Sequence, residues 1–234
     1  MRATVCLPTY NERENLEPML RALQGVLRAG DRVLVIDDSS PDGTGELADR
    51  LAGELPFVDV LHRVHKEGLG PAYLAGFRRA LADGADLVFE LDCDFSHNPA
   101  DIARLRAAVE EGADLALGSR YVDGGAVRNW GLVRQAISRG ASFYTAFFLH
   151  MGVKDPTGGF KCFRRKVLEA IDLDRVTAKG YAFQIETTYR AHRAGFRIVE
   201  VPITFTDRTV GRSKMSRAIV LEAAWRVPLL RLGR

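Results

Sequence analysis

The sequence predicts an α/β fold in which a doubly wound, mostly parallel sheet carries helices on both faces. Short apolar runs alternate with segments whose apolar residues recur every three or four positions. The connections between these segments are short, as in repeated βα units. In addition, 234 residues with 47% hydrophobic content are enough to bury the core of one such domain.

The first half of the chain contains the clearest elements. Strands are expected where apolar, strand-forming residues run together, at residues 3–8, 32–37, 58–63, 87–91 and 113–118. Helices are expected between them, around residues 16–27, 45–55, 71–81 and 99–109. Pro71 and Pro99 begin the last two of these helices, because proline is tolerated in the first helical turn. The order of these elements indicates repeated βα units.

After residue 121 the pattern is less regular. Helices are expected over residues 133–151 and 180–194, followed by a strand over 197–205. Residues 218–232 are apolar and interrupted by Pro228. No linker, repeat or low-complexity tract divides the chain, so we expect a single main domain.

Composition excludes several classes of protein. The three cysteines are odd in number and lack metal-ligand spacing, which favours reduced thiols in a cytosolic setting. The first ten residues resemble a strand rather than a signal peptide. No apolar run reaches the roughly 18 residues that span a bilayer, so we expect a soluble or peripheral protein. Residues 205–234 are rich in arginine and lysine, and such a basic end attracts phosphates.

Two carboxylates, Asp92 and Asp94, end the predicted strand at residues 87–91. Ligands of α/β proteins bind at this edge of the sheet, and Mg²⁺ or Mn²⁺ prefers carboxylate and phosphate oxygens. The pattern is therefore compatible with a metal–diphosphate site. An acidic loop that caps the next helix is an equally simple interpretation, because two aspartates at this spacing are a weak signal alone.

A second acidic pair, Asp37 and Asp38, ends another strand of the same sheet. Four carboxylates around one crevice repel each other unless a cation or hydrogen-bond donors lie among them. A nucleotide–metal complex would supply both. Asp37 and Asp38 could instead form turns with the serines that follow, because Asp and Ser favour turns. A phosphoacceptor receiver domain also clusters aspartates, but its acidic pair follows the first strand, where this chain has residues 8–12.

Three segments together resemble the family 2 glycosyltransferases of GT-A fold. They are Pro8-Thr9-Tyr10-Asn11-Glu12, the run from Val35 to Thr44 with its Asp37-Asp38 pair, and Asp92-Cys93-Asp94. Further segments are similar to the polyprenol (dolichol) phosphate mannose synthases. These are Gly118–Tyr121, Arg134 with Ser138-Arg139-Gly140, Asp155–Lys161, Gly180–Glu186, and Arg208 with Gly211–Lys214. The resemblance covers about residues 5–216.

The resemblance implies a role for each matching residue. The nucleotide base and ribose would lie against Pro8, Tyr10, Glu12, Asp37 and Asp38. Asp92 and Asp94 would hold Mg²⁺ or Mn²⁺ on the diphosphate, with Cys93 nearby and Ser96 as a weak third ligand where some members have glutamine. Arg208 and Lys214 would close over the donor diphosphate. Arg120, Arg134 and Ser138 would bind the phosphate of the lipid acceptor.

The chemistry of such a transfer requires residues of these kinds. A leaving diphosphate needs positive charge against it, which a metal, Arg208 and Lys214 would supply. A lipid monophosphate needs no general base, because its second pKa is about 6 by analogy with protein phosphate esters. Two arginines, Arg120 and Arg134, match phosphate oxygens in bidentate geometry. Solvated surface arginines are the plainer alternative for these two positions.

We therefore predict an inverting glycosyltransferase with Asp94, Arg120 and Arg134 as catalytic residues. It would transfer mannose from GDP-mannose to polyprenyl (dolichyl) monophosphate. One alternative is the same reaction with a UDP-glucose or UDP-amino sugar donor, since no motif distinguishes the base. A more distant alternative is a non-catalytic nucleotide-binding subunit. His97 is expected to be structural, and Glu186 either orients sugar hydroxyls or pairs with a basic residue.

The lipid acceptor implies contact with a membrane surface. We assign residues 1–216 to the GT-A catalytic domain and 217–234 to a basic, apolar segment. Residues 143–151 and 219–232 are the apolar candidates for this contact, and basic residues flank the second one, which suits a helix at an anionic interface. Both segments could equally pack on the sheet. We expect a peripheral protein on the cytoplasmic face, either bound directly or through a membrane-anchoring partner subunit, with no nucleic acid partner.

Overall fold

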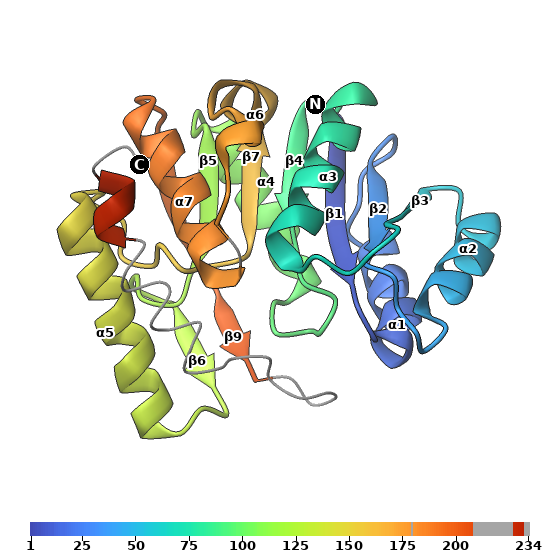
Figure 1. Ribbon diagram of the computed structural model, residues 1–234, viewed down its shortest axis with the longest axis horizontal. Helices are drawn as coiled ribbons and strands as arrows, with labels where there is room; N and C mark the ends of the chain where they lie inside the picture. Colours follow the sequence, from blue (N-terminus) through green and yellow to red (C-terminus); the bar gives the residue numbers. More distant parts are fainter. Residues whose placement is uncertain (179, 208–226, 232–234) are drawn as a thin grey trace.

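The computed structural model describes residues 1–178, 180–207 and 227–231. Within them, a seven-stranded sheet has the order β3-β2-β1-β4-β7-β5-β8 (Figure 1). Its strands are β1 (Ala3–Thr9), β2 (Arg32–Asp37), β3 (Val58–His62), β4 (Leu87–Glu90), β5 (Leu115–Ser119), β7 (Lys161–Arg164) and β8 (Ile198–Pro202). All described pairings in this sheet are parallel except those of β7, which runs antiparallel between β4 and β5.

Helices cover both faces of the sheet, as predicted for a doubly wound fold. Apolar side chains of α1 (Arg13–Gln24), α2 (Thr44–Glu54) and α4 (Ile102–Glu110) pack in one buried cluster. Those of α3 (Leu69–Ala82), α6 (Arg165–Ala170) and α7 (Gly180–Arg193) pack in a second cluster on the other face. Two short 3₁₀ helices, η1 (Pro99–Asp101) and η2 (Leu173–Arg175), complete these layers. The expected helical periodicities are therefore confirmed.

A small second sheet and a long helix lie beside the carboxyl ends of the central strands (Figure 1). The sheet pairs β6 (Ala126–Arg128) with β9 (Thr204–Thr206). The helix is α5 (Leu132–Leu149), whose C-terminal end packs on α7 in a third apolar cluster with Val227. Among the described residues, no helix is long and apolar enough to cross a membrane.

Several details differ from the predicted elements, and the short elements β6 and α6 were not expected. The single strand expected over residues 197–205 is two strands in different sheets. The change of partner occurs at Ile203, whose amide donates to the Ser119 carbonyl at the end of β5 and whose carbonyl accepts from the Ala126 amide of β6. The antiparallel strand β7 was not predicted. It is four residues long and contains Lys161 and Arg164, so it lacks the apolar run that identifies a buried strand.

Candidate active site

The candidate site lies at the carboxyl ends of β1, β2 and β4, which are neighbours in the sheet. A non-glycine residue with positive φ follows each of these strands: Asn11 at 56°, Ser39 at 61° and Phe95 at 56°. Such backbone is uncommon outside glycine and clusters at functional sites. The positive-φ residue turns the chain just after each strand. The residues between the strand and this turn therefore lie at the carboxyl edge of the sheet.

Asp37 and Asp38 are buried at the end of β2, each 4% exposed. Asp37 accepts hydrogen bonds from the Ser40 amide at 3.1 Å and the Ser40 hydroxyl at 2.6 Å. Asp38 accepts one from the Gly68 amide at 2.9 Å and forms an ion pair with Arg63. The turn contacts with Ser40 are therefore present, and β1 lies between β2, which ends in this pair, and β4, which precedes the second acidic pair.

The other predicted nucleoside residues line the same edge. Pro8 is buried in β1, opposite Ile36 of β2. The ammonium group of Lys66 lies 3.5 Å from the centre of the Tyr10 ring. Glu12 precedes α1 and accepts a hydrogen bond from the Asn15 side-chain amide at 2.8 Å. An aromatic ring and a partly buried carboxylate beside Asp37 are suitable surroundings for a base and a ribose.

Asp92 and Asp94 follow β4, and hydrogen bonds fix one oxygen of each. The Tyr73 hydroxyl donates to Asp92 Oδ1 at 2.9 Å. The Ser96 amide donates to Asp94 Oδ1 at 2.9 Å. Burial and the neighbouring Asp92 raise the pKa of Tyr73 well above its usual value, so its hydroxyl stays protonated as a donor. Burial likewise raises the pKa of the Cys93 thiol, which makes it a poor metal ligand.

The donor atoms at Asp92 and Asp94 fit a hard divalent cation, because both offer carboxylate oxygens. In the part of the chain that the structure describes, no group of three or more His, Cys, Asp or Glu side chains is arranged to hold a metal. An ion there would therefore complete its shell with phosphate, water or hydroxyl oxygens, as Mg²⁺ commonly does. Ser96 is 3% exposed, and its described contact with Asp94 is through the backbone rather than the hydroxyl.

A buried polar cluster supports this loop from beneath. Lys161 and Glu90 are both fully buried and form an ion pair at 3.4 Å. The Lys161 ammonium also donates to the Gln184 carbonyl and the Thr187 hydroxyl, each at 3.0 Å. Burial raises the pKa of Glu90 and lowers that of Lys161. This cluster was not predicted, although a lysine between Phe160 and Phe163 was a possible signal.

Arg120 and Arg134 both lie close to one aromatic ring. The centre of the Trp130 ring is 5.7 Å from the Arg120 guanidinium carbon and 4.1 Å from that of Arg134. Arg134 also pairs with Asp207 at 2.7 Å and is 30% exposed, and the Tyr121 hydroxyl donates to the predicted Ser138 at 2.7 Å. The three residues predicted to bind the acceptor phosphate therefore lie in one region, around Trp130 and the start of α5.

Arg120 is held far more tightly than a surface arginine. It is 7% exposed, and its Nε and Nη2 groups donate to the two Asp155 oxygens at 2.7 and 2.6 Å. Nη2 also donates to the Thr157 hydroxyl at 2.8 Å. Asp155 was not predicted as a site residue, because the sequence does not indicate its contact with a residue 35 positions earlier. The alternative interpretation, a solvated surface arginine, is therefore wrong for Arg120.

His97 lies between the two regions. Its ring packs against Phe160 and Phe205, with centres 5.3 and 5.1 Å apart. Burial lowers the pKa of His97 to about 4, so the ring is neutral near pH 7. The Thr206 amide donates to the Ser96 carbonyl at 3.0 Å, which ties β9 to the loop of Asp94. The packing role expected for His97 agrees with these contacts.

Glu186 has a basic partner, one of the two roles left open for it. It is 2% exposed, accepts a hydrogen bond from the Arg190 Nε at 2.8 Å and another from the Ala178 amide at 3.0 Å. Arg208, Lys214 and residues 217–226 lie outside the described residues.

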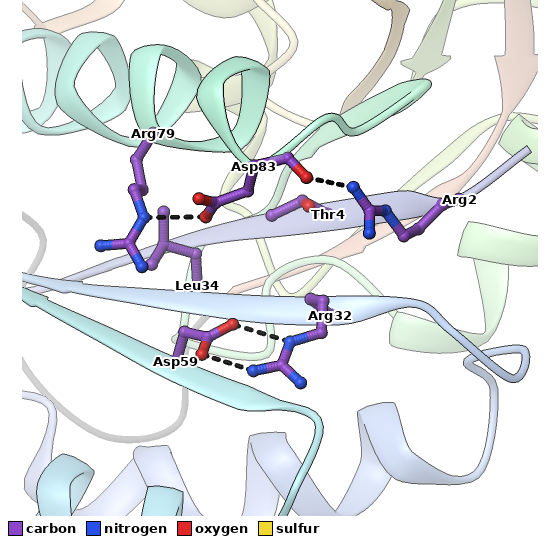
Figure 2. A pocket seen from close by; sticks show the side chains of 7 residues that line it. All are labelled: Arg2, Thr4, Arg32, Leu34, Asp59, Arg79 and Asp83. Atoms are coloured by element: carbon purple, nitrogen blue, oxygen red, sulfur yellow. Dashed lines mark hydrogen bonds and ion pairs between the residues drawn. The ribbon is translucent and has the colours of Figure 1, made fainter.

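A hollow lies at the opposite, amino end of the strands. It is lined by Arg2, Thr4, Arg32, Leu34, Asp59, Arg79 and Asp83 (Figure 2). Three arginines there could attract an anion. However, Arg32 pairs with Asp59, Arg79 pairs with Asp83 at 2.8 Å, and Arg2 donates to the Asp83 carbonyl. The arginines thus already have partners within the fold, and the hollow contains none of the predicted site residues.

Comparison with known proteins identifies the family. Residues 4–172 match the family described as Glycosyl transferase family 2. The chain belongs to this family. It is 52% identical over 227 residues to polyprenol monophosphomannose synthase of Mycolicibacterium smegmatis, covering 97% of this chain and 85% of that protein. It is 50% identical over 223 residues to undecaprenyl-phosphate mannosyltransferase of Micrococcus luteus, covering 95% and 91%.

The fold also has a relative of known structure. A mannosyltransferase from Pyrobaculum calidifontis, solved with GDP-Man and Mn²⁺, superimposes with a TM-score of 0.62 at 19% identity. The match covers 91% of this chain and 58% of that one. The predicted family and the predicted GT-A fold class are both confirmed.

Proposed function

We propose that this family 2 glycosyltransferase transfers mannose from GDP-mannose to polyprenyl monophosphate and inverts the anomeric centre. The observation that carries the proposal is the 52% identity to a polyprenol monophosphomannose synthase along 97% of the chain. The site adds chemical support. It contains carboxylates suited to a metal–diphosphate and arginines suited to a phosphate. His97, which follows the carboxylates, packs on Phe205, and Phe205 also packs on Arg120.

The donor half of the proposed site uses the carboxylates at the ends of β2 and β4. Asp37 and Asp38 would accept hydrogen bonds from ribose and base, together with Tyr10 and Glu12 along the pocket wall. Asp92 and Asp94 would hold Mg²⁺ or Mn²⁺, which neutralises charge on a leaving diphosphate when bound. The hydrogen bonds from Tyr73 and Ser96 fix one oxygen of each carboxylate. Arg208 and Lys214 would add positive charge from the opposite side.

The acceptor half would use Arg120, Arg134 and Ser138. Asp155 holds the Arg120 guanidinium in one orientation, and both arginines lie close to the Trp130 ring. A phosphate dianion between these groups would need no general base, because most of it is already ionised near pH 7. A phosphate oxygen would attack the anomeric carbon from the face opposite the diphosphate, which gives a β-linked product from an α-linked donor.

Helix α5 supports peripheral binding to a membrane. Five large apolar side chains of α5 are more than half exposed: Leu132, Val133, Ile137, Phe143 and Phe147. A hollow beside them is lined by Tyr121, Arg139, Phe143, Ala146, Gly152, Val153 and Lys154. Apolar residues beside cations suit a lipid tail under an anionic headgroup layer.

The remaining assignments are part of the same proposal. Residues 1–216 would form the catalytic domain and 217–234 a second interfacial segment. The protein would bind the cytoplasmic face of the membrane, directly or through an anchoring partner subunit.

The proposal is tested by incubating the protein with Mn²⁺, undecaprenyl phosphate in detergent and radiolabelled donors, then counting label in the lipid extract. GDP-mannose is expected to label the lipid, and omitting either Mn²⁺ or the lipid should abolish the signal. Transfer from UDP-glucose or a UDP-amino sugar alone would overturn the mannose assignment and leave the reaction class intact. Binding of nucleotide without any transfer would favour a non-catalytic subunit.

A further inference from the structure

Helix α3 contacts both acidic pairs of the candidate site. The amides of Gly68 and Glu67, just before its first turn, donate to the two Asp38 oxygens at 2.9 and 3.4 Å. Five positions after Gly68, the Tyr73 hydroxyl donates to Asp92 Oδ1 at 2.9 Å. One rigid element thus reaches a residue of the proposed nucleoside pocket and a proposed metal ligand.

The Tyr73 ring is fixed by its surroundings. The residue is fully buried, and its ring stacks on that of Phe183 with centres 5.9 Å apart and an angle of 3° between the planes. Phe77 packs against the same ring at 5.8 Å. With its ring held this way, the hydroxyl has little freedom to leave Asp92, and a carboxylate bound to a fixed donor is itself oriented.

Close packing also fixes the helix. A Cβ on Gly70 would lie 2.9 Å from the Ala178 carbonyl oxygen, and one on Gly76 would lie 2.9 Å from the Ile36 Cδ1 atom. The first contact is with a backbone atom, so α3 sits directly against the segment before α7, and at Gly76 the helix packs closely on the Ile36 side chain of β2. The helix that carries Tyr73 is therefore closely packed on two sides.

We propose that Tyr73 is a positioning residue that orients Asp92 for the divalent cation, and that α3 thereby links the nucleoside pocket to the metal site. The inference rests on the proposed function, in which Asp92 holds the metal of a nucleoside-diphosphate donor. Packing alone does not require a tyrosine, because phenylalanine would fill the same space among Phe77 and Phe183. The hydroxyl oxygen is the atom that distinguishes the two, and its described partner is Asp92.

The test is Tyr73→Phe, which removes that one atom. The matched control is Tyr189→Phe, another buried tyrosine, whose hydroxyl contacts Arg193 on α7. Mn²⁺ is titrated into each protein in the presence of GDP, and free Mn²⁺ is followed by electron paramagnetic resonance. UDP serves as the parallel probe. GDP affinity without metal and thermal melting are measured on the same samples.

Loss of a hydrogen bond to a metal ligand typically weakens metal affinity by about 10- to 100-fold. We expect a rise of that size in the Mn²⁺ dissociation constant of Tyr73→Phe, with metal-free GDP affinity unchanged and the control like wild type. Excess Mn²⁺ should then restore much of the lost turnover. A Mn²⁺ affinity within about twofold of wild type would overturn the inference, and so would an equal loss of metal-free GDP affinity.

A second variant covers the case in which Tyr73→Phe does not fold. Phe183→Leu keeps the hydroxyl and removes the stacked ring, and is expected to weaken Mn²⁺ binding severalfold. If this is the variant that folds, an Mn²⁺ affinity equal to that of wild type overturns the inference. Failure of the proposed function is separately visible, because wild-type protein would then transfer no mannose to lipid while the Mn²⁺ titration is still measured.

Discussion

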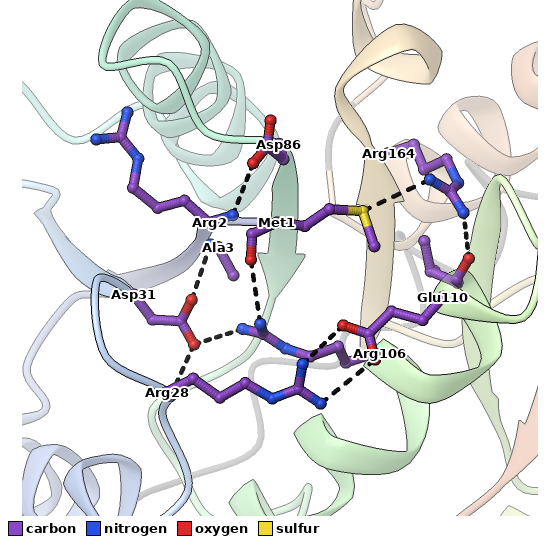
Figure 3. A network of polar contacts seen from close by, with 10 residues as sticks. Met1, Arg2, Ala3, Arg28, Asp31, Asp86, Arg106, Glu110 and Arg164 are labelled. Carbon is purple, nitrogen blue, oxygen red and sulfur yellow. Dashed lines mark hydrogen bonds and ion pairs between the residues drawn. The ribbon is translucent and has the colours of Figure 1, made fainter.

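At the amino ends of the strands the buried carboxylate of Asp31 pairs with Arg106, whereas at the carboxyl ends Asp37 and Asp94 accept hydrogen bonds from Ser40 and Ser96. Figure 3 shows the first arrangement, in which Asp31 also accepts from the Ala3 and Arg28 amides, each at 2.9 Å. An arginine cancels the charge of its partner. A hydroxyl or amide fixes a carboxylate and preserves its charge.

The two sets of contacts differ in what they join: the Asp31–Arg106 pair ties separate segments of the fold together, and the bonds from Ser40 and Ser96 orient carboxylates of the candidate site. Asp31 and Arg106 are 1% and 2% exposed, and their attraction holds β1, the loop before β2 and α4 together. Asp38 combines both kinds of contact, because it forms an ion pair with Arg63 and also accepts a hydrogen bond from the Gly68 amide. Mutations at the amino edge should therefore lower stability and leave activity unchanged. Mutations of the carboxylates at the carboxyl edge should lower activity with little change in stability.

The largest effect is expected for Asp31→Ala. Removing one partner of a buried ion pair leaves the other charge unpaired, which lowers the free energy of unfolding by about 3–5 kcal/mol. For a domain of this size the melting temperature should fall by roughly 6–20 °C. Thermal melting by circular dichroism measures this, and transfer activity assayed well below the melting point should stay near wild type. A stable but inactive variant would contradict the comparison.

The opposite signature is expected for Asp94→Asn. Asparagine keeps the oxygen that accepts from the Ser96 amide but loses the negative charge, so the fold should melt within a few degrees of wild type. Transfer of mannose to lipid should fall by about 10²- to 10³-fold, as for removal of one electrostatic group from a transition state. Asp174→Asn, an 85% exposed aspartate, is the control and should be fully active. Unchanged labelling of lipid by Asp94→Asn would exclude it from the site.

This contrast was only partly predictable from the sequence. Apolar runs that end in Asp37 and Asp92 gave the strands and the shared edge, because parallel strands carry their carboxyl ends together. The contacts that orient these carboxylates are between distant residues. Tyr73 lies among apolar residues at helical spacing, a pattern that predicts a buried core residue. The sequence does not indicate that its hydroxyl donates to Asp92.

The acceptor region shows the same limit. The resemblance to the family placed Arg120 and Arg134 together, and the structure puts both around Trp130. Asp155 and Asp207, which pair with them, come from segments 35 and 73 residues away. Spacing along the chain carries no information about such pairs, so the sequence could indicate the arginines and not what holds them.

A smaller effect is expected for Arg134→Ala. A hydrogen bond to a charged group contributes about 1.5–3 kcal/mol, so the KM for polyprenyl phosphate should rise by roughly ten- to hundredfold. The KM for GDP-mannose should not change, because Arg134 belongs to the acceptor half. Arg134→Lys keeps the charge but loses the bidentate geometry, and is expected to recover only part of the loss. Initial-rate kinetics with each substrate varied in turn measures both constants; an equal rise in the two would move Arg134 to the donor half.

The smallest effect is expected for Arg79→Ala in the hollow of Figure 2, which tests whether the amino edge has any function besides stability. Arg79 and its partner Asp83 are 44% and 50% exposed on one face of α3. Exposed pairs four residues apart contribute about 0.3–0.5 kcal/mol, so chemical denaturation should show a shift of that order. Both KM values and kcat should equal those of wild type. A change in the KM of either substrate would show that this hollow affects substrate binding. The amino edge would then have more than a structural role.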